Sequence, residues 1–166
     1  MNELYNEILK ALCVYKSALC DAMVLCQSWG YNGHKRKYRW YERHFNNYCL
    51  EIKNEMFDEH NIIANTGHVE IPAYKPRDIK EHSIEWLKIV AGTLTIVIKA
   101  HNALLIAAGK RSCAVEKVID CLYKEQEKAR RFIVRGEDIQ WMTHDLHRQD
   151  DVLHEKIKKK EKKDGH

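Results

Sequence analysis

Four side chains that can ligate a metal follow one another at helical spacing in the second quarter of the chain. His44, Glu51, Glu55 and Asp58 are separated by seven, four and three residues. These offsets return to nearly the same angle on a helix of 3.6 residues per turn, so the four side chains share one face. Imidazole and carboxylate ligands suit iron or another divalent metal. The pattern predicts either a metal site or a solvated, charged helix face.

Two further polar residues, Glu59 and Gln126, fall at helical spacing between apolar residues. A buried carboxylate costs several kcal/mol unless it is paired, so Glu59 needs a partner if it faces the core. His101, which lies within the most apolar segment, is the candidate partner. This set predicts a satisfied hydrogen bond in the core, and a remnant metal site that includes Glu59 is the alternative.

Basic residues concentrate in two runs, although the net charge of the chain is only +4. The first run is interleaved with aromatic residues that could stack on bases or pack on a neighbour. The second lies near the C-terminus, where six lysines face one glutamate between residues 156 and 163. Both runs predict sequence-independent binding to DNA phosphates through counterion release, and a merely solubilising end is the alternative for the second. The candidate nucleic-acid-binding residues are Lys35, Arg36, Lys37, Arg39, Lys156, Lys158, Lys159, Lys160, Lys162 and Lys163.

The elements that must position these residues are helices. Apolar residues recur at helical spacing over residues 4–27, 38–64, 81–108 and 112–135, and a weaker pattern follows until it ends beyond Ile157. Gly67 is the predicted cap of the second helix, and Ser112 is the predicted N-cap of the fourth. Both prolines, Pro72 and Pro76, fall in the long connection 68–80. Two short turns and one long connection predict an all-α bundle, either of the ferritin-like plan or an ordinary helical bundle with a long loop.

Local sequence adds a family resemblance to this plan. The string QSWGYNG at residues 27–33 is similar to the junction between the first two helices of Dps proteins, the mini-ferritins, with Trp29 and Gly33 matching. The run 124–129 resembles a segment of the fourth Dps helix. The resemblance covers residues 4–135. It implies a ferritin-like four-helix bundle over residues 1–135 with a long crossover, and a helical extension with a lysine-rich tail over residues 136–166.

The resemblance also implies function: an oligomeric shell that stores or sequesters iron, binds DNA without sequence preference and protects it. Dps proteins place iron between subunits, and Ser28 stands where the family has a metal-ligating histidine. No Glu-x-x-His pair occurs on the second or fourth predicted helix, so the ferroxidase centre of other ferritins is not expected. We therefore expect iron as the cofactor and at most weak ferroxidase activity. The metal candidates are His44, Glu51, Glu55, Asp58 and Glu59.

Two alternatives belong to other classes of protein. A non-enzymatic helical scaffold or shell would keep the bundle for assembly alone. A ribonuclease of the HEPN family would use the Arg-x4-His spacing of Arg39 and His44, a spacing that also arises often by chance. No phosphate-binding glycine loop, nucleophile elbow or HExxH motif is present.

Composition sets the remaining expectations. Six cysteines lie singly in helical segments, which predicts reduced thiols, with Cys13 and Cys20 buried as small hydrophobes. We expect no membrane span and no signal sequence, hence a cytoplasmic protein. Large aromatic residues on the second helix, expected to be exposed, predict a homo-oligomer: Tyr38, Trp40, Tyr41 and Tyr48.

Overall fold

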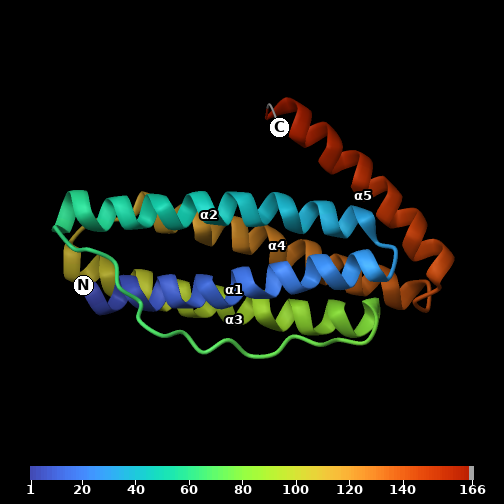
Figure 1. Cartoon of the computed structure of the whole chain (residues 1–166), viewed down its shortest axis with the longest axis horizontal. Coiled ribbons are helices and arrows are strands. Elements are labelled where there is room, and N and C mark those ends of the chain that lie inside the picture. The colour runs from blue at the N-terminus through green and yellow to red at the C-terminus, as the bar shows by residue number, and fades with distance from the viewer. Residues whose placement is uncertain (165–166) are drawn as a thin grey trace.

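The protein is all-helical, as predicted, in a computed structural model that describes residues 1–164. Its elements in chain order are α1 (Asn2–Ser28), α2 (Asn32–His60), α3 (Ile79–Ala108), α4 (Cys113–Asp138) and α5 (Thr143–Lys163). The first four helices lie side by side along the long axis of the molecule, and α5 leaves the end of α4 to lie against the first part of α2 (Figure 1). Gly165 and His166, the end of the predicted tail, lie outside the described residues.

The apolar pattern that predicted α1 is the face that this helix buries. Ile8, Leu12, Tyr15 and Leu19 are fully buried, and α1 packs against both α2 and α3. The chain then turns within three residues, where Gly30 has a φ of 84° that a residue with a Cβ rarely adopts. The short turn makes α1 and α2 antiparallel neighbours (Figure 1).

The bounds of α2 differ from the prediction at both ends. The helix begins at Asn32 rather than at residue 38, and it ends at His60, where Asn61 forms a left-handed cap with a φ of 54°. Gly67 is therefore not the cap. Residues 61–78 contain no helix, and their trace runs along the outside of the bundle from the end of α2 to the start of α3 (Figure 1).

Helix α3 is the most apolar element and has both of its ends capped locally. The Asp78 side chain accepts a hydrogen bond from the Glu81 amide at 2.8 Å, and Gly109 ends the helix with a φ of 72°. By length and composition, α3 alone among the helices of residues 1–164 could cross a membrane, which the sequence analysis did not anticipate. Its buried residues, including Trp86 and Val90, pack in the bundle core against α1 and α4.

The C-terminal helices correct the expected end of the fold. Ser112 caps α4 as predicted, since its hydroxyl accepts from the Val115 amide at 3.2 Å. A tight turn after Asp138 contains Gln140 and Trp141 with positive φ, and α5 then continues to Lys163. The helix thus continues beyond Ile157, where the apolar spacing ends, and Glu161, one turn later, is also buried.

Candidate functional site

The predicted metal ligands do not come together. Glu51 pairs with Lys117 at 3.1 Å, Glu59 pairs with Lys110 at 3.1 Å, and Glu55 accepts hydrogen bonds from the hydroxyls of Tyr5 and Ser112. Asp58 is exposed, and the His44 ring stacks on Trp40 with centroids 3.7 Å apart. Within residues 1–164, no three His, Cys, Asp or Glu residues form a group that could hold a metal ion. The common helix face is therefore divided among separate polar contacts.

The other sequence-predicted polar pairs are also separate. Glu59 is exposed rather than buried, and the buried His101 instead accepts from the Ser112 amide at 3.4 Å. Arg39 is exposed, and an offset of five residues turns a helix by about 140°, so Arg39 and His44 face different directions. These contacts correct the expected Glu59–His101 bond and give no support to a paired Arg39–His44 site.

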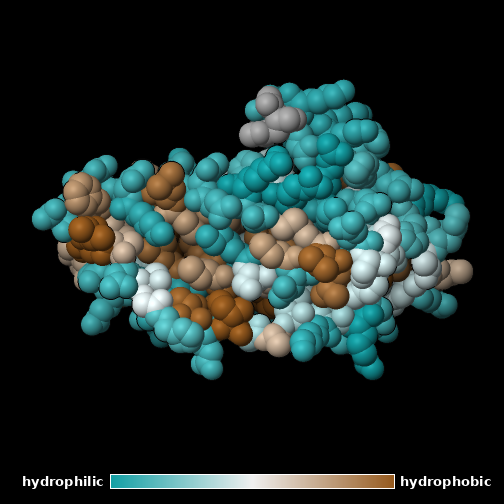
Figure 2. All heavy atoms as spheres, viewed as in Figure 1, coloured by the Kyte–Doolittle hydropathy of each residue, from teal (hydrophilic) through white to brown (hydrophobic). Residues whose placement is uncertain are grey.

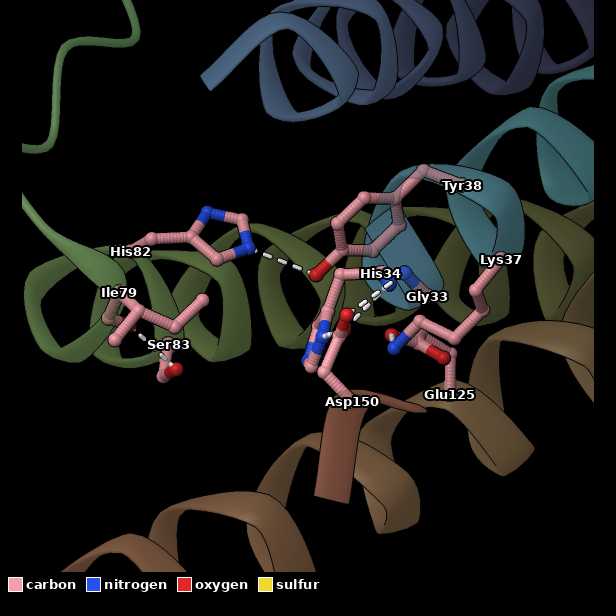
Figure 3. A network of polar contacts seen from close by, with 9 residues as sticks. All are labelled: Gly33, His34, Lys37, Tyr38, Ile79, His82, Ser83, Glu125 and Asp150. Carbon is pink, nitrogen blue, oxygen red and sulfur yellow. Dashed lines mark hydrogen bonds and ion pairs between the residues drawn. The ribbon is translucent and has the colours of Figure 1, made fainter. Parts of the chain in front are cut away.

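A buried ion pair, which the sequence analysis missed, links α2 to α4. Glu125, not its neighbour Gln126, faces the core with 1% exposure, and its Oε1 accepts from the Lys37 ammonium at 3.3 Å and from the Trp86 indole at 2.9 Å. The pair is seen from close by in Figure 3. A buried charge needs both a counter-charge and hydrogen bonds. Lys37 and Trp86 supply them to Oε1, whereas Oε2 is buried without a donor from residues 1–164.

A buried histidine links the long connection to the bundle. His82 uses both ring nitrogens: Nε2 lies 2.7 Å from the Tyr38 hydroxyl and Nδ1 lies 2.5 Å from the Tyr74 hydroxyl. Burial, with smaller contributions from His34 and Lys37, holds the pKa of His82 well below its ordinary value of 6.5. His82 is therefore neutral at pH 7, and it ties Tyr74 of the connection to α2 and α3.

The start of α2 is capped by a residue of α5. The Asp150 carboxylate accepts from the backbone amides of Gly33 and His34, both at 2.8 Å, and from His34 Nδ1 at 2.5 Å (Figure 3). Burial would raise the pKa of Asp150, but the hydrogen bonds from His34 and Gly33 outweigh it and the pKa is lowered. Burial also holds the pKa of His34 below its ordinary value of 6.5. The contact is therefore a hydrogen bond from a neutral imidazole to an ionised carboxylate. One side chain of α5 thus satisfies two amides that a helix start leaves free.

Further contacts hold α5 along α2. The Arg36 guanidinium donates to Glu161 at 2.7 and 3.0 Å, the Tyr31 and His147 rings stack with centroids 4.3 Å apart, and the Lys160 ammonium lies 4.6 Å from the centre of the Trp40 ring. The only glutamate within the lysine run is therefore bound to α2. The two predicted basic runs, which are more than a hundred residues apart in sequence, lie next to each other.

The predicted nucleic-acid-binding residues fall into two groups. Arg36 and Lys37 are bound internally, to Glu161 and Glu125, which leaves them little capacity for an external phosphate. Figure 2 shows a strongly hydrophilic surface over α5, where the predicted lysines are exposed. The residues with no carboxylate partner within residues 1–164 are Lys35, Arg39, Lys156, Lys158, Lys159, Lys160, Lys162 and Lys163.

A cavity of about 470 Å³ lies between α2, α4 and α5, and we call it the basic cavity. Half of its lining residues are Lys or Arg, and none is Asp or Glu. A row from α4 faces the row from α5, and each row follows the three- or four-residue spacing that puts side chains on one helix face. The lining residues are His34, Lys37, Lys128, Arg131, Phe132, Arg135, Gln149, Val152, Leu153, Lys156, Ile157 and Lys160.

No protein-family model matches this chain, and comparison with curated proteins finds no match. The fold and the site define the protein as an all-helical bundle with a cationic cavity between α2, α4 and the fifth helix.

Proposed function

We propose that this protein binds nucleic acid through its phosphates, without reading base sequence, and that it does so as a ferritin-like, Dps-related bundle. The observation that carries the proposal is the convergence of the two basic runs. Six lysines of α5 are exposed without a carboxylate partner within residues 1–164, and Lys35 and Arg39 extend this surface onto α2. Clustered cations of this kind bind phosphates through counterion release, so affinity depends on salt rather than on sequence.

The arrangement of the helices supports the ferritin-like part of the proposal. Short turns connect α1 to α2 and α3 to α4, while an 18-residue connection separates the two pairs. The Dps resemblance implies two activities, and the described contacts favour DNA binding over iron storage, because the predicted iron ligands are engaged with separate partners. Iron storage and ferroxidase activity remain predictions.

The test is the salt dependence of DNA binding. We expect labelled duplexes of two unrelated sequences to bind with equal affinity, with a steep loss of affinity as salt increases. Replacing Lys158, Lys159, Lys162 and Lys163 by glutamine should weaken binding to both duplexes and flatten the slope by about 0.9 in log units for each phosphate contact that is lost. Fluorescence anisotropy between about 50 and 200 mM salt measures both quantities.

A matched control separates this surface from net charge. Lys10, Lys53, Lys75 and Lys80 are exposed and unpaired within residues 1–164, and their replacement by glutamine removes the same charge elsewhere. The control variant should keep the slope of the unchanged protein. Equal losses in both variants, or no binding at the lowest salt, would contradict the proposal and favour the scaffold alternative.

A further inference from the structure

The basic cavity holds positive charge that residues 1–164 do not neutralise. Of its six Lys and Arg residues, only Lys37 has a carboxylate partner within residues 1–164. The other five line the cavity without one: Lys128, Arg131, Arg135, Lys156 and Lys160. Elsewhere on α4, Lys124 pairs with Asp120 and Arg130 pairs with Glu127. On α4, the cations without a carboxylate partner within residues 1–164 are thus the ones that face the cavity.

Repulsion between the cations of α4 and those of α5 indicates that the cavity lacks an anion. Burial, and then the charge of Lys160, lower the pKa of Lys128, although Lys128 belongs to α4 and Lys160 belongs to α5. Helix α5 is bound to α2 through Asp150 and Glu161, and no ion pair joins it to α4 in the described part of the chain. An anion with charge at more than one point would bridge the two rows and remove this repulsion.

Most of the remaining lining is apolar, which suits the faces of an aromatic ring. Phe132 of α4 and Leu153 and Ile157 of α5 border the cavity between the rows of cations. The Gln149 side chain adds a polar group, because its Oε1 is buried without a donor from residues 1–164. An exocyclic amine of a nucleobase would supply that donor. A volume of about 470 Å³ lies within the range of small-molecule sites.

We propose that the basic cavity binds a free nucleoside di- or triphosphate, whose phosphates bridge Arg131 and Arg135 on α4 to Lys156 and Lys160 on α5 while the base lies against Phe132 and Ile157. This goes beyond the proposed DNA binding, because Lys128, Arg131 and Arg135 belong to neither basic run. The bound nucleotide would join α5 to α4, a connection that the described contacts do not provide.

The first experiment compares ligands on the unchanged protein at constant ionic strength. The probes are ATP, adenosine and inorganic tripolyphosphate, each followed by isothermal titration calorimetry and thermal unfolding. We expect ATP to bind and, at a concentration of about a hundred times its Kd, to raise Tm by roughly 5 °C or more. Adenosine should bind at least about tenfold more weakly than ATP, because it lacks the phosphates that meet the cations.

Tripolyphosphate tests the role of the base. It should bind more weakly than ATP, since it gains nothing from Phe132, Ile157 and Gln149. Equal binding of ATP and tripolyphosphate would overturn the nucleotide assignment and leave a general anion site. Absence of ATP binding, with salt-dependent DNA binding retained, would overturn this inference alone and leave the proposed function standing.

The second experiment uses charge-matched variants on each wall. Arg131→Gln with Arg135→Gln should weaken ATP binding by about tenfold or more, whereas Lys124→Gln with Arg130→Gln, also on α4 but outside the cavity, should not. On α5, Lys156→Gln with Lys160→Gln is compared with Lys158→Gln and Lys162→Gln. Similar losses in cavity and control variants would mean that ATP responds only to net charge, and the assignment would fail. Circular dichroism confirms that each variant remains helical.

Discussion

At the scale of single residues, the buried ion pair between Lys37 and Glu125 predicts that removing one charge costs more stability than removing both. Lys37→Met removes the counter-charge and leaves a carboxylate with 1% exposure, which should cost about 3–5 kcal/mol in the free energy of unfolding. Adding Glu125→Gln removes the stranded charge while keeping an oxygen acceptor for the Trp86 indole. The double variant should therefore be more stable than Lys37→Met. Urea denaturation of the unchanged protein, the two single variants and the double variant measures the coupling energy between the two side chains. A double variant that is less stable than Lys37→Met would contradict the buried pair.

Buried neutral histidines predict a loss of stability in mild acid. The pKa values of His34 and His82 are lowered in the folded protein, while in the unfolded chain both rings titrate near 6.5. Below that pH the unfolded chain binds protons that the folded protein does not, so the free energy of unfolding decreases as pH falls. Asp150, whose pKa is lowered from 3.8, adds a further loss only below that value.

Replacing His82 by glutamine should flatten this pH dependence. The amide can contact both tyrosine hydroxyls but does not titrate, so the difference in urea midpoint between about pH 7.5 and 5.5 should shrink relative to the unchanged protein. The exposed His144, replaced in the same way, serves as the control. An unchanged pH dependence in His82→Gln would show that other groups cause the loss.

Residue patterns anticipated the apolar core better than the polar one. Ile8, Leu12, Phe45 and Ile52 lie in the segments 4–27 and 38–64 with apolar residues at helical spacing, and all are fully buried. Glu125 was missed in favour of Gln126. Neighbouring residues differ by about 100° around a helix, and the spacing of apolar residues does not say which of the two faces the core. Cys20, expected to be buried, is exposed for the same reason. All six cysteines are free, as expected.

At the scale of elements, helix ends were predictable where the capping group is local. Ser112 caps its own helix, and Gly109 lies directly after α3, so both signals are contained in a few residues. The start of α2 was placed six residues late because its cap, Asp150, lies 117 residues from Gly33 in sequence. The basic cavity could not be predicted for the same reason, since the position of α5 decides which lysines face α4.

The close approach at Gly33 gives a prediction for the docking of α5. A Cβ on residue 33 would lie 2.2 Å from the Asp150 carbonyl oxygen and 2.9 Å from the His154 amide, both backbone atoms that cannot move without moving α5. Gly33→Ala should therefore displace α5 and expose its amides to hydrogen exchange, while α1, α3 and α4 keep their protection. Basic-cavity binding of ATP should be lost in the same variant.

Gly92→Ala provides the matched control for that variant. Gly92 lies inside α3 with no atom within 4 Å of an added Cβ, so alanine should increase the free energy of unfolding by about 0.5–1 kcal/mol. Exchange of α5 should be unchanged. If Gly33→Ala left α5 as protected as Gly92→Ala does, the close contact between α2 and α5 would be absent in solution.

At the scale of the whole molecule, the aromatic side chains of α2 that were expected to drive assembly are not exposed. Tyr38 and Tyr41 are buried in the core and Trp40 and Tyr48 are half-buried, because α5 and the neighbouring bundle helices cover that side of α2. Exposed apolar side chains occur on several helices, among them α3, where Ile84, Ile96 and Ile106 are 40%, 48% and 86% exposed. The homo-oligomer therefore remains a prediction, and we now expect its contact on α3 rather than on α2.

Assembly through the outer side of α3 makes a specific prediction about mass. Apolar side chains exposed to water favour burial against a second copy, and a stable contact buries about 800 Å² on each partner. We expect an oligomer in light scattering at micromolar concentration, and Ile96→Glu with Ile106→Glu should reduce it to monomer, because two carboxylates would have to lose their hydration in the contact. Val134→Glu, at a position of α4 that is 56% exposed, should leave the mass unchanged. If the unchanged protein were a monomer, the shell hypothesis would fail. DNA binding by that monomer would show that the basic surface acts without assembly. Its affinity should then be low, because it lacks the avidity of many copies.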